Sequence, residues 1–351
     1  MGTTLPHSVS IPEGPVSGPR RPRVLLAVYA PEPAWSLPDP LRDRLARSFP
    51  GVSWSADPGW HRGYGPDLED ADAAFLWHLP PEDLARAGRL RWVHSAATGV
   101  RRLLYPEMRR AGVTVTCSRG VHARFMAEHV LAWILAHYRR LSVLRDAQRE
   151  KRWAKDALLA GPRPASLRGR TVVVAGYGAA GAALAGLLAP FAVTVIGIKR
   201  DPGSGGEGAQ RIVGGGSASE VAAALGEADV VVNALPNTDA TALWFDAERL
   251  AAVKPGAFFV NVGRGATVDE AALAAVLETG KLSGAGLDVF AEEPLAPQSP
   301  LWELNGVQIA PHVAGYADTL WEALTQAFAD NLERFLAERP LHGTADFDRG
   351  Y

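Results

Sequence analysis

The sequence predicts an α/β protein with two doubly wound domains. Short apolar runs alternate with helix-forming segments along nearly the whole chain, and one run leads directly into a glycine-rich turn and a helix. Strands that alternate with helices pair in parallel, and the helices then cover the faces of the sheet. Both halves of the chain share this βα rhythm, so we expect two such sheets.

The clearest unit covers residues 171–201. A buried strand over 171–175 (TVVVA) runs into a G-x-G-x-x-G turn, and helix formers and a second strand over 193–198 follow. In a Rossmann unit the three glycines allow the tight turn, the approach of a pyrophosphate and close helix packing, while the helix N-terminus faces the phosphates. A purely structural turn is the alternative, but it does not explain the flanking strands. The predicted dinucleotide contacts are Gly176, Gly178, Ala179, Ala180 and Gly181.

The end of the second strand indicates which dinucleotide binds. An acidic residue about 20 positions after the turn accepts hydrogen bonds from the ribose 2′-hydroxyl of NAD. Here Lys199 and Arg200 occupy that place, and Asp201 comes one or two positions too late. Two cations suit the 2′-phosphate of NADP. We therefore expect NADP(H) to be preferred and NAD(H) to be possible; the alternative is that both side chains point into solvent.

Composition argues against several classes of protein. The 351 residues suffice for two domains, and 47% hydrophobic and 21% charged residues are typical of a soluble globular chain. A formal net charge of −2 gives no electrostatic reason to expect nucleic acid or membrane binding. Cys117 is the only cysteine, so no internal disulfide can form. With neither an apolar signal segment nor a membrane-spanning run, we expect a cytoplasmic protein.

The pattern divides the chain into a leader and two domains. Residues 1–21 are rich in Pro, Gly and Ser and are predicted to be disordered. Residues 22–120 together with 318–351 are predicted to form the first domain, which is therefore discontinuous and flavodoxin-like. Residues 121–317 are predicted to form the second, Rossmann-like domain.

Two long helices are expected to connect these domains. One covers 125–138 and leads into the second domain, and the other covers 316–336 and returns to the first. Residues 100–111 are predicted to be one helix, 151–164 a surface connection and 214–219 a loop. The expected strands are 22–29, 51–55, 73–79, 90–94 and 113–117 in the first domain, and 171–175, 193–198, 229–235, 257–262, 284–289 and 307–310 in the second.

Three polar groups lie at or just beyond the ends of predicted strands of the second domain. Arg264 stands between two glycines, Asp288 and Glu293 belong to an acidic loop, and His312 follows the last strand. Taken singly, each has a structural explanation as a surface arginine, a solvated acidic loop or a packed histidine. Ligands in such folds bind outside the carboxyl ends of the strands, however, and a guanidinium there can grip a carboxylate and polarise a carbonyl.

The chain resembles the D-2-hydroxyacid dehydrogenases over essentially all of residues 22–340. The resemblance rests on GYGAAG, LPNTDAT (235–241), KPGAFFVNVGRG (254–265), GLDVFAEEP (286–294) and APHVAGY (310–316), in this order. It implies that Arg264 binds the substrate carboxylate and carbonyl, that His312 is the acid/base and that Glu293 pairs with it. Asp288 would hold the nicotinamide carboxamide. Further implied cofactor contacts are Leu235, Pro236, Thr241, Val262, Gly263 and Gly315.

The resemblance also implies that a loop of the first domain holds the substrate carboxylate through backbone N–H groups. In this chain the loop is 95–100, with Ala97, Thr98 and Gly99 as the contacts. His78 could line the same cleft, although a half-buried histidine at a strand end is an equal alternative. The family more often has Asp after the Gly-Val pair, where this chain has Arg101.

These residues predict an NAD(P)-dependent 2-hydroxyacid dehydrogenase acting on a small 2-keto acid of the glyoxylate or hydroxypyruvate type. Arg264 would stabilise the charge on the carbonyl oxygen, by about 3 kcal/mol, while His312 donates the proton. Formate or phosphite oxidation is a related reaction within the resemblance, and the formate-oxidising enzymes have Gln in place of Glu293, which argues against formate oxidation. A dinucleotide-binding corepressor or scaffold of the same fold is the alternative. Relatives pair through their cofactor domains, so a homodimer is expected; no metal site is predicted.

Overall fold

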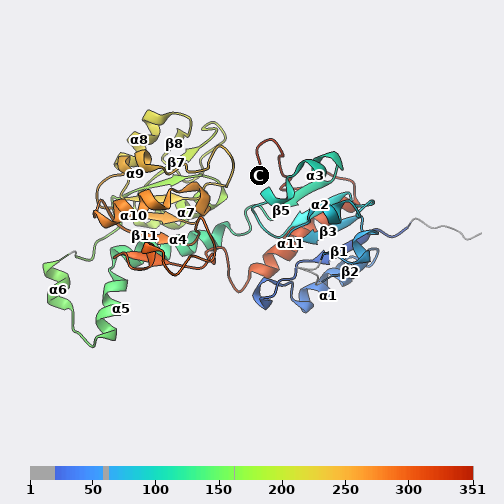
Figure 1. Cartoon of the computed structure of the whole chain (residues 1–351), viewed down its shortest axis with the longest axis horizontal. Coiled ribbons are helices and arrows are strands. Elements are labelled where there is room, and N and C mark those ends of the chain that lie inside the picture. The colour runs from blue at the N-terminus through green and yellow to red at the C-terminus, as the bar shows by residue number, and fades with distance from the viewer. Residues whose placement is uncertain (1–19, 58–62, 162, 351) are drawn as a thin grey trace, which may run out of the picture.

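The computed structural model describes residues 20–57, 63–161 and 163–350. In this part of the chain two lobes lie side by side, each built on one parallel β-sheet (Figure 1). The predicted α/β fold with two doubly wound units is therefore confirmed. Most of the predicted leader, residues 1–19, lies outside the described residues.

The first lobe contains a five-stranded sheet in the order β2-β1-β3-β4-β5. All its strand pairs are parallel, and this order is that of flavodoxin-like folds. Every residue of β3 and β4 is buried, because helices cover both faces of the sheet. The elements are β1 (Arg23–Ala27), α1 (Asp39–Ser48), β2 (Ser53–Ala56), β3 (Ala73–Leu76), α2 (Pro81–Leu84), β4 (Trp92–Ser95), α3 (Pro106–Arg110) and β5 (Thr114–Cys117).

The C-terminal helix α11 (Leu320–Leu336) returns to this first sheet, as Figure 1 shows. Phe328 stacks on Phe75 of β3 at 4.5 Å between ring centroids and on Trp92 of β4 at 5.3 Å. Its apolar face therefore completes a core that begins with β1, some 300 positions earlier in the sequence. The helix begins at Leu320 and not at the predicted residue 316.

The second lobe contains a seven-stranded parallel sheet in the order β12-β11-β10-β9-β6-β7-β8. Its strand order reverses between β6 and β9, so the carboxyl ends of these two strands form the switch point where ligands bind in such sheets. The strands are β6 (Thr171–Ala175), β7 (Thr194–Lys199), β8 (Arg211–Gly214), β9 (Val230–Asn233), β10 (Ala257–Asn261), β11 (Leu282–Leu287) and β12 (Val307–Ile309).

The helices of this lobe are α7 (Ala179–Leu188), α8 (Ala218–Glu227), α9 (Ala247–Ala252) and α10 (Glu270–Glu278). Side-chain caps fix three of their starts. Ser217, Asp246 and Asp269 each accept a hydrogen bond from the backbone N–H three residues later, which satisfies a donor that the helix leaves unpaired. The start of α7 has no side-chain cap, because Gly178 precedes it.

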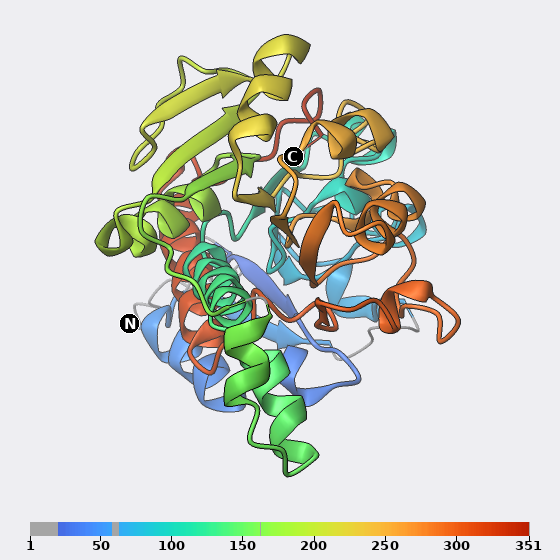
Figure 2. The ribbon, with the colours of Figure 1, turned by 90° about the vertical axis from the view of Figure 1, so that its left-hand side faces the viewer.

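A long helix leads from the first lobe into the second and continues into a projecting arm. Helix α4 (Ala123–Tyr138) packs mainly on α7 and the large sheet, and it leads into α5 (Leu141–Arg149) and α6 (Lys155–Ala160). Figures 1 and 2 show α5 and α6 as an arm that projects away from both sheets. The arm carries several exposed apolar side chains, among them Trp153, which is 90% exposed.

Three local predictions were wrong. Residues 100–111 form a 3₁₀ turn (Arg101–Leu103) and the separate helix α3, because Tyr105 before Pro106 is forced into an extended conformation. Residues 151–164 contain helix α6 as well as a connection. Residues 214–219 are not one loop, because β8 ends at Gly214 and α8 begins at Ala218.

Candidate active site

The glycine turn after β6 has the close packing that its sequence demands. Gly176 has φ 86°, and a Cβ at this position would lie 2.6 Å from the carbonyl oxygen of Ala234, in the loop after β9. A Cβ on Gly181 would lie 2.9 Å from the ring of Tyr177. Both positions therefore need glycine, and the turn brings the loops after β6 and β9 into contact at the switch point.

The helix that starts at this turn presents unpaired donors. Within the described part of the chain, the N–H groups of Ala179, Ala180 and Gly181 have no hydrogen-bond acceptor. Gly178 and Ala179 are exposed, so no side chain covers this end of α7. Unpaired N–H groups and the positive end of the helix dipole fit the pyrophosphate of a dinucleotide.

Lys199 is the last residue of β7, and Arg200 follows it. The Lys199 ammonium donates to the carbonyl oxygens of Ser204 (3.2 Å) and Gly205 (2.7 Å). It therefore fixes the loop after β7 on the same side of the sheet as the glycine turn. No acidic residue stands at the end of β7, since Asp201 lies two residues beyond the strand and accepts from the Gly203 N–H at 3.0 Å.

Arg264 is positioned by the two glycines that flank it. A Cβ on Gly263 would lie 2.7 Å from the carbonyl oxygen of Leu235, and one on Gly265 would lie 1.8 Å from the carbonyl carbon of Phe290. The backbone on either side of Arg264 is therefore wedged between the loops after β9 and β11. Only glycine fits there, which explains the sequence G-R-G at the end of β10.

A network of buried polar side chains fixes the loop that carries Arg264. Asn233 at the end of β9 donates to the side chains of Asn261 (2.9 Å) and Thr267 (2.7 Å). Asn261 accepts from the N–H of Gly263 at 3.2 Å, and Thr267 donates to the carbonyl oxygen of Arg264 at 2.6 Å. Since these three side chains are buried and mutually satisfied, they fix the backbone that carries the guanidinium.

His312 and Glu293 form the pair that the resemblance implies. His312 Nδ1 lies 2.7 Å from Glu293 Oε2, and Oε1 of the same carboxylate accepts from the N–H of Phe290 at 3.0 Å. Because a carboxylate only accepts, Nδ1 carries the hydrogen and Nε2 is left for a ligand. His312 has φ 56°, which is rare for a residue with a side chain and occurs mainly where the surrounding structure enforces it.

Asp288 helps to hold the backbone of His312 in this conformation. Its two carboxylate oxygens accept from the N–H groups of Val313 (2.7 Å) and Ala314 (3.0 Å), and its carbonyl oxygen accepts from the N–H of His312 at 2.8 Å. Burial raises the pKa of Asp288, and these two hydrogen bonds oppose the effect. The loop after β11 thereby fixes the loop after β12.

Arg264 lies close to this pair. Burial lowers the pKa of the guanidinium, while the negative charges of Glu293 and Asp288 oppose that effect. Its Nη1 donates to the carbonyl oxygen of Gly263 at 2.6 Å. From the other lobe Gly99 approaches so closely that a Cβ there would lie 2.7 Å from Nη2. The structure thus brings Arg264, Glu293 and His312 together, facing the loop 95–100.

Two residues at the contact between the lobes were not among the predicted site residues. His122 lies with Nδ1 3.0 Å from the carbonyl oxygen of Gly315 and Nε2 3.4 Å from that of Ala96. Arg101 pairs with Asp239 at 2.6 Å in the loop after β9. The replacement of the family's usual Asp at position 101 was visible in the sequence, whereas nothing in the sequence singles out His122.

The remaining predicted residues lie around these loops with differing contacts. Thr241 donates to the carbonyl oxygen of Pro236 at 2.5 Å, and Thr98 to that of Ser118 at 3.4 Å. His78 makes no hydrogen bond with Arg264, Glu293 or His312 among the described residues, and its buried Nδ1 has no partner there. Leu235 and Ala97 are half-buried, Val262 is buried in the core beneath the site, and Gly315 accepts from His122.

Two doubly wound sheets, an uncapped glycine turn and a gathered arginine, glutamate and histidine define the class of dinucleotide-dependent dehydrogenases. A sequence model of the D-isomer specific 2-hydroxyacid dehydrogenase NAD binding domain matches residues 131–314. The glyoxylate/hydroxypyruvate reductase A of Serratia proteamaculans (strain 568) is 33% identical over 298 residues, which cover 83% of this chain and 90% of that protein.

Solved structures agree with this match. A D-isomer specific 2-hydroxyacid dehydrogenase from Xanthobacter autotrophicus Py2, in complex with NADPH and MES, has a TM-score of 0.81 at 31% identity and covers 95% of this chain and 100% of that one. The NADPH-dependent glyoxylate/hydroxypyruvate reductase of Sinorhizobium meliloti, in complex with NADP and sulfate, has a TM-score of 0.77 at 29% identity, with 94% and 100% coverage. The chain therefore belongs to the D-isomer specific 2-hydroxyacid dehydrogenase family.

None of the helices in the described ranges is both long and apolar enough to cross a membrane. No group of three or more His, Cys, Asp or Glu side chains in the same ranges is arranged to hold a metal ion.

Proposed function

We propose that this enzyme reduces a small 2-keto acid of the glyoxylate or hydroxypyruvate type with NADPH. The observation that carries the proposal is the convergence of Arg264 with the His312–Glu293 pair, opposite Gly99 of the other lobe. A half-buried guanidinium can bind a carboxylate and its neighbouring carbonyl, and an imidazole beside them can deliver a proton. The reductase names of the Serratia and Sinorhizobium relatives support the same substrate class.

The residues of this chain would share the reaction as follows. A bound dihydronicotinamide would supply the hydride for the carbonyl carbon of the substrate. Arg264 holds the substrate carboxylate and stabilises the negative charge on the carbonyl oxygen, which is worth about 3 kcal/mol for a preorganised donor. His312 donates the proton from Nε2 to that oxygen, while Glu293 keeps the hydrogen on Nδ1 and the ring in place. In the reverse direction neutral His312 accepts the proton.

The two lobes would bind different ligands. We infer that residues 22–120 with 318–351 form the substrate-binding domain and residues 121–317 the cofactor-binding domain. The N–H groups of loop 95–100 would hold the substrate carboxylate opposite Arg264. The uncapped start of α7 would hold the cofactor pyrophosphate.

The choice of cofactor is supported by Lys199 and Arg200 at the end of β7. We expect NADPH to bind at least about tenfold tighter than NADH, because two cations attract the 2′-phosphate. The Arg200→Ala variant should reduce this preference, and Arg211→Ala, on the neighbouring strand and paired with Glu227 at 2.7 Å, is the matched control. Equal binding of both dinucleotides by the unaltered protein would reject the proposal.

A panel of 2-keto acids with each cofactor, followed by the absorbance of the reduced nicotinamide, tests the activity directly. His312→Ala should abolish reduction while the cofactor still binds. Turnover of glyoxylate or hydroxypyruvate that depends on His312 would support the assignment. Cofactor binding with no turnover of any 2-keto acid would favour the corepressor or scaffold instead.

We also propose that the protein is a cytoplasmic homodimer that pairs through its cofactor-binding domain. The arm of α5 and α6 supports this, because Leu141, Leu144, Trp153 and Leu159 are between 41% and 90% exposed on it. The free thiol of Cys117 suits a reducing compartment. Light scattering should give twice the mass of the chain, and Trp153→Ala should lower it. Trp302→Ala, 51% exposed elsewhere on the same lobe, should leave the mass unchanged.

A further inference from the structure

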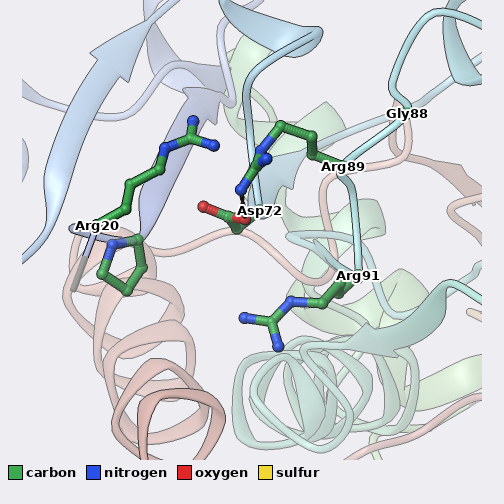
Figure 3. Close-up of a pocket in the computed structure, with 6 residues that line it drawn as sticks. Arg20, Asp72, Gly88, Arg89 and Arg91 are labelled. Atoms are coloured by element: carbon green, nitrogen blue, oxygen red, sulfur yellow. Dashed lines mark hydrogen bonds and ion pairs between the residues drawn. The ribbon is translucent and has the colours of Figure 1, made fainter. Parts of the chain in front are cut away.

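A second recess lies at the opposite end of the first lobe from the candidate active site. Its residues precede strands: Pro22 comes before β1, Asp72 before β3, and Arg91 before β4. The strands are parallel, so this recess opens at their amino ends, whereas Gly99 meets Arg264 beyond their carboxyl ends. The recess is open to solvent, has a volume of about 540 Å³ and is lined by Arg20, Pro22, Asp72, Gly88, Arg89 and Arg91 (Figure 3).

Three guanidinium groups surround one carboxylate in this recess, as Figure 3 shows. Arg89 Nη2 lies 3.2 Å from Asp72 Oδ1, and Asp72 Oδ2 accepts from the backbone N–H of Arg23 at 2.9 Å. Both oxygens of the carboxylate are therefore occupied, and its side chain is only 11% exposed. Asp72 neutralises one arginine and has little capacity for a second.

The positive charges of Arg20 and Arg91 are not fully neutralised by neighbouring carboxylates. Arg20 approaches Asp70 at 3.8 Å and donates to its carbonyl oxygen at 3.3 Å, but Asp70 also pairs with Arg23. The guanidinium carbon of Arg91 lies 4.7 Å from the centroid of the Phe335 ring, and no carboxylate pairs with Arg91 among the described residues. When Arg23 and Asp70 beside the recess are included, four arginines lie near two carboxylates (Asp70 and Asp72). This leaves a local formal charge of +2, whereas the net charge of the chain is −2.

This arrangement is preorganised for an anion. The stack on Phe335 and the pair with Asp72 hold two guanidinium groups in place, so little side-chain freedom is lost when they bind a ligand. Arginine donors match phosphate and carboxylate oxygens in geometry, and the bonds are charge-assisted. The volume is within the range of small-molecule sites, and an excess of two positive charges matches a ligand with two or more negative charges.

We propose that this recess binds a small polyanion, either a compound with two phosphate groups or a di- or tricarboxylate. The ligand would not overlap the dinucleotide or the keto acid, since the recess lies at the amino ends of the strands of the five-stranded sheet and the candidate active site lies beyond their carboxyl ends. The proposal is therefore independent of the reaction inferred above.

Inorganic pyrophosphate and citrate are suitable probes, titrated calorimetrically into the full chain at low ionic strength. The Arg91→Gln variant removes a guanidinium that has no carboxylate partner in the described ranges, so folding should be unaffected, as thermal unfolding can verify. We expect about one equivalent of probe to bind, and roughly a tenfold loss of affinity in this variant. Arg110→Gln is the matched control, because Arg110 is exposed on the same lobe and pairs with Glu107 at 2.6 Å.

The outcomes separate the possible ligands. Binding of pyrophosphate alone would assign the recess to phosphates, and binding of both probes would assign it to polyanions in general. Binding that is insensitive to Arg91→Gln would mean that the probe occupies another site, such as the start of α7, and would overturn the proposal. Absence of binding by either probe would overturn it as well.

Discussion

Gly99→Ala tests the contact between the first lobe and Arg264. The added Cβ would lie 2.7 Å from Nη2, 3.6 Å from Cζ and 3.7 Å from Nε of Arg264, and these are its three nearest neighbours. An ordinary contact begins near 3.4 Å, so the guanidinium must move by about 0.7 Å. Its Nη1 is bonded to the carbonyl oxygen of Gly263 at 2.6 Å, and the movement would lengthen this bond.

The two consequences of this substitution differ in size. Gly99 is not in the left-handed region, and the group that must move is the far end of a flexible side chain. The free energy of unfolding should therefore change by less than about 1 kcal/mol. The guanidinium, however, would be displaced from the position that binds substrate, and a misplacement of about 1 Å costs on the order of 10²-fold in rate. We expect kcat/KM for the keto acid to fall roughly tenfold to 100-fold.

Steady-state kinetics, urea unfolding and cofactor binding measure these effects separately. Gly51→Ala is the control, because a Cβ at that position would have no neighbour within 4 Å. Gly99→Ala should bind the cofactor as tightly as the unaltered protein does. Unchanged kcat/KM in Gly99→Ala would refute the reasoning, since it would mean that Arg264 does not act from the position the structure gives it.

Three further predictions concern the pair beside Arg264, the lobe contact and a buried histidine. Glu293→Gln should lower kcat about 100-fold without affecting cofactor affinity, and Glu292→Gln, its exposed neighbour, should leave kcat unchanged. Arg101→Gln removes the exposed pair with Asp239 and should change the free energy of unfolding by less than about 1 kcal/mol; a larger loss in urea unfolding would show that the pair holds the lobes together. Burial lowers the pKa of His94 to about 3, so the folded state excludes a proton that the unfolded chain binds below its ordinary pKa of about 6.5. The free energy of unfolding should therefore be highest above pH 6.5 and decrease on acidification, by about 2 kcal/mol between pH 7 and pH 5. The His94→Asn variant should show a smaller dependence on pH.

The sequence predicted the structure best in strands whose residues are nearly all buried. Strands such as Thr171–Ala175 are covered on both faces, so they read as unbroken apolar runs, and their ends were predicted to within three residues. The glycine turn was equally clear, because Gly176 needs its positive φ for local reasons. Segment 100–111 has helix-forming residues but is not one helix, because Pro106 restricts Tyr105 to an extended conformation.

Contacts between distant loops lay beyond the sequence pattern. Arg101 was recognised as a departure from the family, but its partner Asp239 belongs to the other lobe, and no local pattern relates the two. The recess of Arg20, Arg89 and Arg91 exists only because three strands begin side by side. Helix α8 was missed since glycines surround its start, although its cap residue Ser217 was a usable signal.

The amino-acid sequence alone determined the kinds of element, the dinucleotide turn and the identity of the polar residues at the strand ends. These features depend on backbone preferences and on the periodicity of burial, which act over a few residues. Only the tertiary structure decided that Gly99 meets Arg264, 165 positions away, and that Asp288 fixes the backbone of His312. The physical reason is that strand order and the packing of one lobe on the other arise from long-range burial, which no local stretch of sequence encodes.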